Sequence, residues 1–489
     1  MAEPSGRPVP ALLVGDVLRQ SAARTPGRVA ATLGHQAVTF AELSASADRL
    51  TAVLGGRGVH RGDRVAWWGD TSLDCVALYF ALAHLGAVFV PLNPRCTVAE
   101  AEATLAQADP ALVVTDEAHP GQVTVAELLA ARPPSVLDVE EPQEDDAHVI
   151  FFTSGTTGEP KGVVLTQRTE RLRAGNGTWP GGATICMFPQ FHMAGWASTL
   201  NTWLSGDQVA YVARPDAEPL LDAVERHRAQ LMYAIPSVWR RILDTDRSAV
   251  DTSSLRRADT GTSTVTRELL TGLADAFPGA ETSIAYGSTE ASAVCMLWPA
   301  DVLRKIGSVG PPAAGVSVRL DEHGELWASS AQLFTGYFRN PEATEAALVD
   351  GWYRTGELAE VDAEGCYRIV GRVKDLIRTG GETVAPAEVD LVLQEHPAVA
   401  DGAVAGLPDD DWGEVVAAFV VLRPGQQLEL VDLRRHCEGR LASHKHPRRL
   451  VVVDALPRTG PTNQIQRRRL VEQVTGSAGS ADAEAGGTG

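Results

Sequence analysis

Apolar residues follow two alternating patterns along the N-terminal part of the chain. Short apolar runs with the length of buried strands occur at residues 64–68, 88–92 and 111–114. Stretches with apolar residues three and four positions apart, which is typical of helices, lie between these runs at residues 72–85 and 97–108. Strands and helices that alternate in this way predict a parallel sheet covered by helices.

A second alternation of the same kind covers residues 184–243, so we expect two similar α/β subdomains with parallel sheets. Residues 29–40 add a predicted β-hairpin near the N-terminus. Between residues 316 and 370, short strands separated by glycine turns predict a small antiparallel barrel or sheet. The expected fold class is therefore α/β, with the two subdomains and the small β-barrel in one large domain.

The C-terminal part of the chain has a different pattern. We expect the large domain to cover residues 1–372 and a compact α+β domain to cover residues 373–475, with clear elements at 415–422 and 430–441. Residues 476–489 consist only of Gly, Ser, Ala, Asp, Glu and Thr. Because this segment holds too little apolar surface to bury a core, we predict a disordered tail.

The net charge of −19 and the lack of a Lys/Arg-rich block argue against nucleic acid or an anionic membrane as the main partner. An acidic protein can still hold one basic pocket for a nucleotide. The six cysteines are scattered without a C-x-x-C or Cys/His cluster, which argues against a structural zinc site. The polar N-terminus lacks the build of a signal peptide, and no run of 18 apolar residues occurs. We therefore expect no integral membrane contact and a cytoplasmic location.

Residues 153–162 form a stretch rich in glycine and hydroxyl groups, Thr-Ser-Gly-Thr-Thr-Gly-Glu-Pro-Lys-Gly, between apolar residues 149–152 and 163–165. Glycines let the backbone approach an anion closely, hydroxyl and N–H groups donate to it, and a lysine supplies charge. The stretch does not fit the Walker A pattern, because its lysine follows proline and precedes glycine. Alone, it is compatible with a phosphate cradle or with a surface turn.

Three later stretches carry residues that suit the other parts of a nucleotide. Residues 285–290 place Tyr286 to stack on a base and Glu290 to hold a divalent metal, although a capped helix start uses the same residue types. Glu357 follows a glycine turn and suits a pair of ribose hydroxyls, or it is the surface acid of a hairpin turn. Residues 371–382 place glycines around a charged linker, as at a hinge or an ordinary domain boundary.

Together these stretches resemble the adenylate-forming superfamily of acyl-CoA synthetases, peptide-synthetase adenylation domains and luciferases. The resemblance covers roughly residues 12–472 and rests on T-S-G-T-T-G-x-P-K-G, Y-G-x-T-E, Y-R-T-G-[DE] and G-R-x-K-D-x-I, in that order. It implies Mg-ATP, formation of an acyl-adenylate with loss of pyrophosphate, and a mobile C-terminal domain that rotates between two half-reactions. The N-terminal domain would be the AMP-binding domain, and CoA or another nucleophile would accept the acyl group of a small-molecule acid.

The resemblance also assigns roles to individual residues. Those that would wrap the β- and γ-phosphates are Thr153, Ser154, Gly155, Thr156, Thr157 and Lys161. Tyr286 would lie on the adenine, Thr289 would touch the α-phosphate and Glu290 would hold Mg²⁺. Glu357, in place of the commoner aspartate, and Arg372 would bind the ribose hydroxyls.

Further assignments concern the hinge and the acyl side. Lys374 would be the hinge residue between the two domains. His192 matches a histidine beside the acyl pocket, where a purely structural histidine is the alternative. Residues 380–382 would line a pantetheine tunnel in the second conformation. Lys445 matches a lysine near the CoA end, although a solvated surface lysine fits equally well.

The chain departs from the resembled pattern at its C-terminal end. The family has P-R-T-x-x-G-K-I there, and its lysine bridges the acyl carboxylate and the ATP α-phosphate. Gln464 occupies the lysine position if one extra loop residue is allowed, and we keep it in the predicted catalytic set. An amide donates hydrogen bonds but carries no charge. The loss of the cation is expected to slow adenylation by about a hundredfold or more, at ~1.4 kcal/mol per decade, unless Arg458, Arg467 or Arg468 substitutes.

A second departure lies at residues 260–264, where Thr-Gly-Thr-Ser-Thr replaces the G-G-A-P turn of acyl-CoA synthetases and indicates a more polar end of the acid. The leading expectation is an acyl- or aryl-CoA ligase. One alternative is a diazotase-type member that adenylates nitrite and passes it to an aromatic amine in secondary metabolism. The other is a non-catalytic homologue that binds a nucleotide or acyl ligand, which only the replaced lysine supports.

Overall fold

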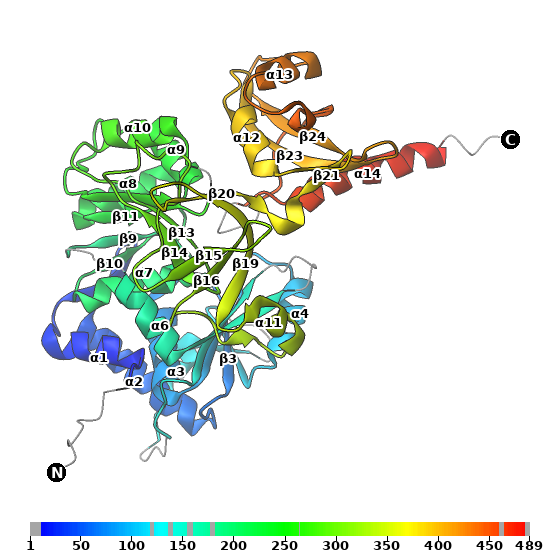
Figure 1. Ribbon diagram of the computed structural model, residues 1–489. Helices are drawn as coiled ribbons and strands as arrows, with labels where there is room; N and C mark the ends of the chain where they lie inside the picture. The colour runs from blue at the N-terminus through cyan, green and yellow to red at the C-terminus, as the bar shows by residue number, and fades with distance from the viewer. Residues whose placement is uncertain are drawn as a thin grey trace, which may run out of the picture.

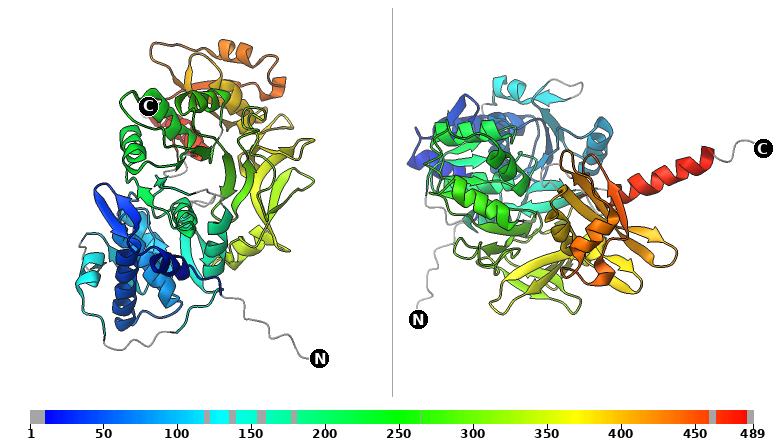
Figure 2. Two further views of the ribbon diagram at one scale, coloured as in Figure 1. Left: turned by 90° about the vertical axis from the view of Figure 1, so that its left-hand side faces the viewer. Right: turned by 90° about the horizontal axis from the view of Figure 1, so that it is seen from above.

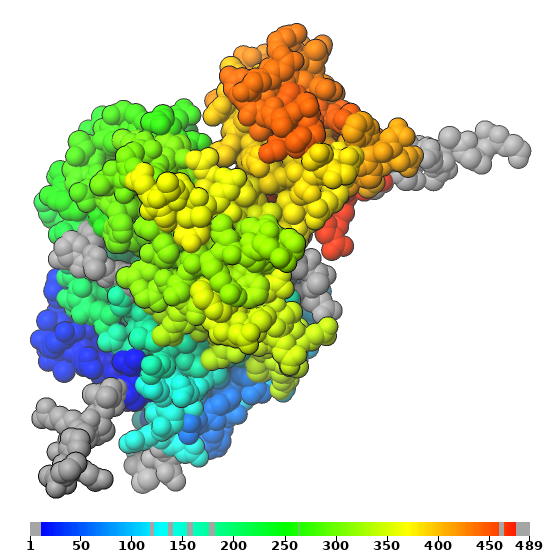
Figure 3. All heavy atoms as spheres, viewed as in Figure 1, coloured from blue at the N-terminus to red at the C-terminus, as the bar shows by residue number. Residues whose placement is uncertain are grey.

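The computed structural model describes residues 11–117, 122–134, 140–153, 160–176, 181–263, 265–458 and 464–484, and for residues 476–484 only the backbone is described. Figure 1 shows one large body and a smaller C-terminal domain, from β21 (Ile377–Thr379) onward, that stands on it. The space-filling view shows this domain, in orange, projecting from the body (Figure 3). In the left view of Figure 2, the blue N-terminal helices lie at the opposite end of the molecule from the C-terminal domain.

The first sheet of the large body has seven strands in the order β17-β8-β7-β4-β3-β5-β6. Its strands are β3 (Arg64–Trp68), β4 (Val88–Pro91), β5 (Leu112–Thr115), β6 (Val123–Thr124), β7 (Ala147–Thr153), β8 (Lys161–Thr166) and β17 (Gly336–Tyr337). Strands β3 to β7 pair in parallel, whereas β8 runs antiparallel to both β7 and β17. The parallel sheet is thus confirmed at its centre, and the glycine-rich stretch connects two antiparallel strands.

The second sheet has eight strands in the order β14-β13-β12-β11-β9-β10-β1-β2. Its strands are β1 (Val29–Leu33), β2 (Gln36–Thr39), β9 (Thr184–Cys186), β10 (Val209–Tyr211), β11 (Leu231–Tyr233), β12 (Arg257–Gly261), β13 (Ile284–Ser288) and β14 (Ser292–Leu297). The predicted N-terminal hairpin is confirmed as β1 and β2. It joins the second sheet through parallel pairing of β1 with β10, about 180 residues away.

Local sequence signals set the ends of the helices of the large body. Thr39 and Glu42 form a capping box at the start of α2, and Thr97 and Glu100 do the same for α4. Gly86 ends α3 in the left-handed conformation at φ 64°, which glycine adopts without strain. These helices are α1 (Gly15–Arg24), α2 (Phe40–Gly56), α3 (Leu73–Leu85), α4 (Val98–Ala108), α5 (Val125–Ala130), α6 (Gln167–Arg173), α7 (Met193–Leu204), α8 (Ala217–His227), α9 (Pro236–Asp244), α10 (Arg267–Ala276) and α11 (Pro341–Ala347).

The two large sheets share one hydrophobic core. Helix α3 is buried from Cys75 to Leu85 and packs against β4 of the first sheet and β1 of the second. Tyr79 of α3 stacks on Trp196 of α7 with ring centroids 3.8 Å apart, and Phe89 of β4 contacts the same indole edge-on. The expected subdomains are therefore two sheets around a common aromatic centre.

The predicted small β unit is a sheet of five antiparallel strands. They are β15 (Ser317–Leu320), β16 (Glu325–Ser329), β18 (Leu348–Val349), β19 (Trp352–Val361) and β20 (Tyr367–Arg372). Strand β20 leads through the short helix η2 (Val373–Asp375) into the C-terminal domain. The chain crosses from one domain to the other at the predicted hinge residue, Lys374.

The C-terminal domain is an α+β unit, as expected. Its strands are β21, β22 (Glu382–Val384), β23 (Val399–Asp409), β24 (Gly413–Leu422) and β25 (Arg449–Val452), and its helices are α12 (Pro386–Gln394), α13 (Leu430–Cys437) and α14 (Arg467–Glu484). Helix α14 begins at Arg467 and is anchored by the buried side chain of Leu470. The disordered tail expected at residues 476–489 stays a prediction. Residues 485–489 lie outside the described residues.

Candidate active site

The predicted phosphate loop lies at one end of the hairpin formed by β7 and β8. Thr153 and Lys161 are register partners at the ends of the two strands, and the Thr153 hydroxyl lies 3.4 Å from the Lys161 carbonyl oxygen. Ser154, Gly155, Thr156 and Thr157 lie outside the described residues. The hairpin therefore fixes the two ends of the loop and places the lysine at its base.

Tyr337 of β17 joins Lys161 to Glu290. The Lys161 ammonium lies 5.1 Å from the centroid of the Tyr337 ring, within range of a cation–π contact. The Tyr337 hydroxyl donates a hydrogen bond to Glu290 Oε1 at 3.1 Å. Lys161 and Glu290, which are 129 positions apart in sequence, thus contact the same tyrosine. Tyr337 was not predicted from the sequence, because it stands in a two-residue strand far from the glycine-rich motif.

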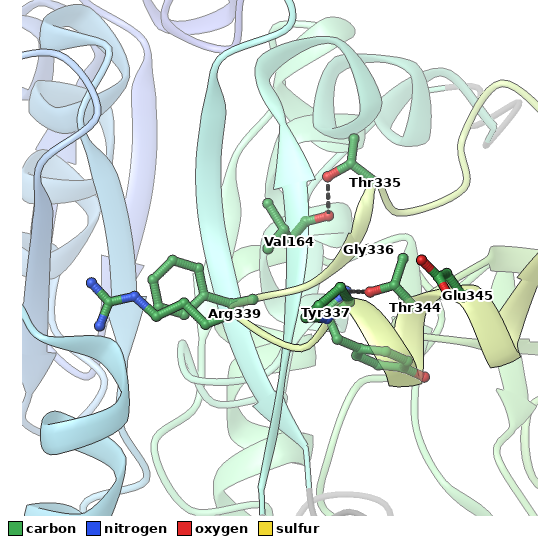
Figure 4. Close-up of a pocket in the computed structure, with 9 residues that line it drawn as sticks. Val164, Thr335, Gly336, Tyr337, Arg339, Thr344 and Glu345 are labelled. Atoms are coloured by element: carbon green, nitrogen blue, oxygen red, sulfur yellow. Dashed lines mark hydrogen bonds between the residues drawn. The ribbon is translucent and has the colours of Figure 1, made fainter.

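Hydrogen bonds from two sides hold β17 in place. The Thr335 hydroxyl donates to the Val164 carbonyl of β8 at 3.3 Å, and the Tyr337 N–H donates to the Thr344 hydroxyl of α11 at 2.8 Å. Figure 4 shows both bonds, together with Arg339 pointing away from α11. The segment and α11 line an open pocket of about 390 Å³. These hydrogen bonds fix the position of the Tyr337 ring between Lys161 and Glu290.

Thr289 and Glu290 form the turn between β13 and β14. These strands are antiparallel, and the Ser288 hydroxyl accepts a hydrogen bond from the Ala291 N–H at 3.2 Å. The alternative of a capped helix start is therefore wrong, since this segment is a β-hairpin. A Cβ atom on Gly287 would overlap the Ser292 carbonyl oxygen, so this close turn requires glycine.

Arg173, the last residue of α6, lies beneath this turn and is only 3% exposed. Its guanidinium donates to the carbonyl oxygens of Thr289 at 2.8 Å, Glu290 at 3.0 Å and Gln332 at 2.8 Å. Arg173 was not predicted from the sequence, because a charged side chain in an Arg-rich segment is expected on the surface. The spacing of Glu170 and Arg173 by three positions was the only available signal.

Glu357 and Arg372, the predicted ribose residues, are register partners on β19 and β20. The Arg372 Nε–H donates to Glu357 Oε1 at 3.2 Å. Tyr286 lies next to this pair: burial raises the pKa of its hydroxyl, and the nearby Glu357 carboxylate raises it further. The structure thus brings together the residues predicted to contact adenine and ribose.

Gln464 reaches this pair from the C-terminal domain. Its Oε1 accepts a hydrogen bond from Arg372 Nη2 at 3.0 Å, across 92 positions of sequence. The hinge residue Lys374 lies nearby in η2, where burial lowers the pKa of its ammonium and the positive charge of Arg372 lowers it further. The orientation of the two domains therefore places the residue at the usual lysine position beside the predicted ribose site.

The three arginines that could replace the missing lysine are all paired with carboxylates of the C-terminal domain. Arg458 contacts Asp401 at 2.7 Å, and Arg468 contacts Glu472 at 2.9 Å within α14. Arg467 bonds Asp390 of α12 and donates to the Val404 carbonyl oxygen at 3.0 Å. Because each of these arginines has such a partner, the expected substitution for the lysine finds no support.

A group of rings lies at the predicted acyl side of the site. Phe188 stacks near His192 with centroids 5.9 Å apart and contacts Tyr233 of β11 at 5.6 Å. The Tyr233 hydroxyl fills the space where a side chain at Gly261 would stand, and Gly261 pairs with Ala285 next to Tyr286. The acyl-side group (Phe188, His192, Tyr233 and Gly261) is therefore continuous with the predicted adenine site.

His192 caps the N-terminus of α7. Its Nδ1 accepts a hydrogen bond from the Ala194 N–H at 3.2 Å. Burial lowers the pKa of the imidazole to about 4, so the ring is neutral at pH 7 and carries its proton on Nε2. Its capping role supports the structural alternative, but the neutral ring still presents one donor beside Phe188.

Lys445, which was predicted to lie near the CoA end, forms an ion pair with the Glu388 carboxylate of α12.

Glu290 suits a magnesium ion that is shared with phosphates. Within the described residues, no group of three or more His, Cys, Asp or Glu side chains could enclose a metal. Magnesium is commonly held by one or two carboxylates together with substrate phosphates, and Glu290 lies with Lys161 on the Tyr337 ring at the base of the predicted phosphate loop. The residues present therefore fit a metal that arrives with its nucleotide.

Comparison with known proteins agrees with this geometry. Residues 18–338 match the AMP-binding enzyme family, and residues 388–462 match the AMP-binding enzyme C-terminal domain. The chain belongs to the AMP-binding enzyme family. The resemblance drawn from the four motifs is confirmed, as is the arrangement of a large α/β domain followed by a small C-terminal one. The family predicts an AMP-forming ligase, and the relatives are of that type.

Two relatives and one solved structure illustrate the similarity. The chain is 36% identical over 472 residues to a feruloyl-CoA synthase of Amycolatopsis sp, covering 89% of this chain and 94% of the relative. It is 32% identical over 493 residues to an indoleacetate–CoA ligase of Aromatoleum aromaticum, covering 92% and 96%. The o-succinylbenzoate coenzyme A synthetase of Bacillus subtilis, solved with ATP and a magnesium ion, is 29% identical with a TM-score of 0.85 and covers 93% and 98%.

None of the helices in the described ranges is long and apolar enough to cross a membrane.

Proposed function

We propose that the protein is an ATP-dependent, AMP-forming ligase that activates an aromatic carboxylic acid and transfers the acyl group to CoA. The observation that carries this proposal is the continuity between two kinds of site. Tyr286, Glu357 and Arg372 provide a nucleotide side, and the acyl-side group begins at Gly261, the register neighbour of Ala285.

The substrate class follows from the rings of the acyl-side group. Phe188, His192 and Tyr233 form a neutral, partly buried surface on which a flat aromatic acid can stack. The Tyr233 hydroxyl closes the space over Gly261 and opposes a long alkyl chain. The feruloyl-CoA synthase, the indoleacetate–CoA ligase and the o-succinylbenzoate synthetase bear aromatic acids in their names, which supports the same class.

In the first half-reaction, the acid carboxylate attacks the α-phosphorus of ATP in line, and pyrophosphate leaves. Lys161 at the base of the glycine-rich loop would attract the β- and γ-phosphates, and Glu290 would hold Mg²⁺. Mg²⁺, when bound, would neutralise charge on the phosphates. Glu357 and Arg372 would fix the ribose, so that positioning carries much of the rate.

In the second half-reaction, the CoA thiolate attacks the acyl carbonyl, and AMP is the leaving group. Lys374 lies where the chain passes between the domains and would serve as the hinge for the change of conformation. In the present conformation Gln464 contacts Arg372, and this contact supports an arrangement of the domains that serves adenylation.

The test is release of pyrophosphate and AMP with Mg-ATP and a panel of acids. The panel contains ferulic acid, indoleacetic acid, benzoic acid, a saturated fatty acid of about twelve carbons and nitrite, each with CoA or an arylamine. We expect pyrophosphate release and a CoA thioester with at least one aromatic acid, and a preference of about tenfold or more in kcat/KM over the fatty acid. Release that requires nitrite and an arylamine, or no release with any acid, would contradict the proposal.

A further inference from the structure

Helix α6 carries two charged side chains that the interior of the large domain buries. Glu170 is 2% exposed and Arg173 is 3% exposed. We propose that Arg173 is a positioning residue, which fixes the turn at Thr289 and Glu290 from below and thereby orients the Glu290 carboxylate toward Mg²⁺. The inference rests on the proposed function, because it concerns how that site is held.

The hydrogen bonds of Arg173 identify its target. The guanidinium donates to two successive carbonyl oxygens of the turn, those of Thr289 and Glu290, and to that of Gln332 on the following segment. The rigid fork of a guanidinium can serve these acceptors at once, whereas a lysine ammonium is a single point of charge. The buried cation thus ties the β13–β14 turn to the segment that precedes β17.

Glu290 is held from two sides. Arg173 and the Phe334 N–H, at 2.7 Å, both donate to its backbone carbonyl, while the Tyr337 hydroxyl donates to its carboxylate. Since backbone and side chain are both fixed, the carboxylate has one preferred orientation. A carboxylate that is oriented before the metal arrives loses less freedom on binding.

The charge of Arg173 is balanced within the interior. Burial lowers its pKa to about 10, and the carboxylates of Glu170 and Glu290 oppose this change, so the guanidinium stays protonated at pH 7. Glu170 accepts a hydrogen bond from the Tyr79 hydroxyl at 3.0 Å, and Tyr79 stacks on Trp196. Two opposite charges buried on one helix are weak evidence for stability, because apolar residues of the same size often serve as well. A role in holding the turn would explain why these two charged side chains are buried.

Binding of ATP with and without magnesium tests the inference on the full-length protein. Isothermal titration calorimetry would compare ATP with Mg²⁺ present and ATP in EDTA. We expect Arg173→Lys to reduce the gain in affinity from Mg²⁺ by about tenfold and to change metal-free ATP affinity by less than about threefold. The matched control is Arg168→Lys on the same helix, where Arg168 pairs with Glu144 at the surface and the gain from Mg²⁺ should not change.

A double-mutant cycle shows whether Arg173 acts through Glu290. In a Glu290→Gln background, Arg173→Lys should no longer alter the gain from Mg²⁺, because the oriented carboxylate is already absent. An equal loss of affinity in Mg²⁺ and in EDTA, or a full effect in the Glu290→Gln background, would overturn the inference.

A second variant covers the case in which Arg173→Lys does not fold. The combined change Glu170→Gln with Arg173→Gln removes both buried charges and keeps similar volumes, and it should show the same loss of the gain from Mg²⁺. If the unaltered protein binds ATP no more tightly with Mg²⁺, the proposed function fails as well. If the unaltered protein gains ATP affinity from Mg²⁺ and the variants show the same gain, only this inference fails.

Discussion

The nucleotide side and the acyl side of the site use opposite chemistry. On the nucleotide side, charged groups from different elements meet, as Glu357 does with Arg372, and Lys161 and Glu290 do through Tyr337. On the predicted acyl side, Phe188 contacts both the neutral His192 and Tyr233. Under the proposed function, the first side would hold a polyanion and a metal, and the second would accept the flat ring of an acid.

This difference teaches where specificity resides. The nucleotide is the same in every turnover of an AMP-forming enzyme, so its contacts are charged, paired and fixed. The acid varies between enzymes of the family, and ring packing can change by single substitutions without disturbing the charged network. Changes on the two sides are therefore expected to affect different kinetic constants.

The largest expected effect is on the nucleotide side. Glu357→Ala removes the carboxylate that we propose to bind ribose, and it leaves the partly buried Arg372 with one partner fewer. We expect the KM for ATP to rise by about 30-fold or more, since hydrogen bonds to charged groups are worth about 1.5–3 kcal/mol. Pyrophosphate release at varied ATP measures this. A change in the KM for the acid of similar size would contradict the separation of the two sides.

Gln464→Lys tests the boundary between the domains. A lysine would place a cation near developing charge at the α-phosphate, so we expect the maximal rate of adenylation to rise by about tenfold. The lysine ammonium would also lie close to the Arg372 guanidinium. Because the two positive charges repel each other, the KM for ATP should rise by about threefold. Single-turnover pyrophosphate release and steady-state KM separate these effects. An unchanged rate of adenylation would show that the Gln464 amide does not limit this step.

Tyr233→Ala sharpens the comparison from the acyl side. Removal of the ring opens the space above Gly261 and takes away a stacking surface. We expect kcat/KM for aromatic acids to fall by about tenfold and that for longer alkyl acids to rise, with the KM for ATP within about twofold of the original. Tyr233→Phe, which keeps the ring and removes only the hydroxyl, is the matched control. Equal losses for all acids would indicate general damage to the fold instead.

The smallest effect on the rate is expected from protonation of His192. Its pKa of about 4 in the folded protein lies below the usual value of 6.5, so the ring stays neutral and should leave the rate unchanged from about pH 6 to pH 8. The unfolded chain binds the proton more readily, so stability falls as pH drops below about 6.5 toward 4. Melting temperatures of the protein and of His192→Asn check this. If the loss of stability persists unreduced in the variant, other groups cause it.

Much of the fold could be read from local pattern. The strand and helix alternation, the N-terminal hairpin and the α+β end of the chain were all predicted. Capping residues such as Thr39 and Ser72 are local signals, because each stands directly before the helix that it caps.

The motif residues of the nucleotide side were also available from the sequence, since each motif is contiguous and its residue types match the chemistry. The residues that hydrogen-bond to these motif residues could not be predicted from the sequence. Tyr337 lies 47 positions from the Glu290 carboxylate it donates to, and Arg173 lies 116 positions from Thr289. Neither partner is marked by its neighbours along the chain.

By itself, the sequence determined the elements, the presence of a nucleotide site and the family-like order of its motifs, because these depend on contiguous residues. Only the tertiary structure decided that β1 and β2 complete the second sheet, that Gln464 bonds Arg372, and that Arg173 is buried under the turn at Glu290. Pairings of this kind depend on which surfaces the chain buries against one another, and burial is a property of the whole packed molecule.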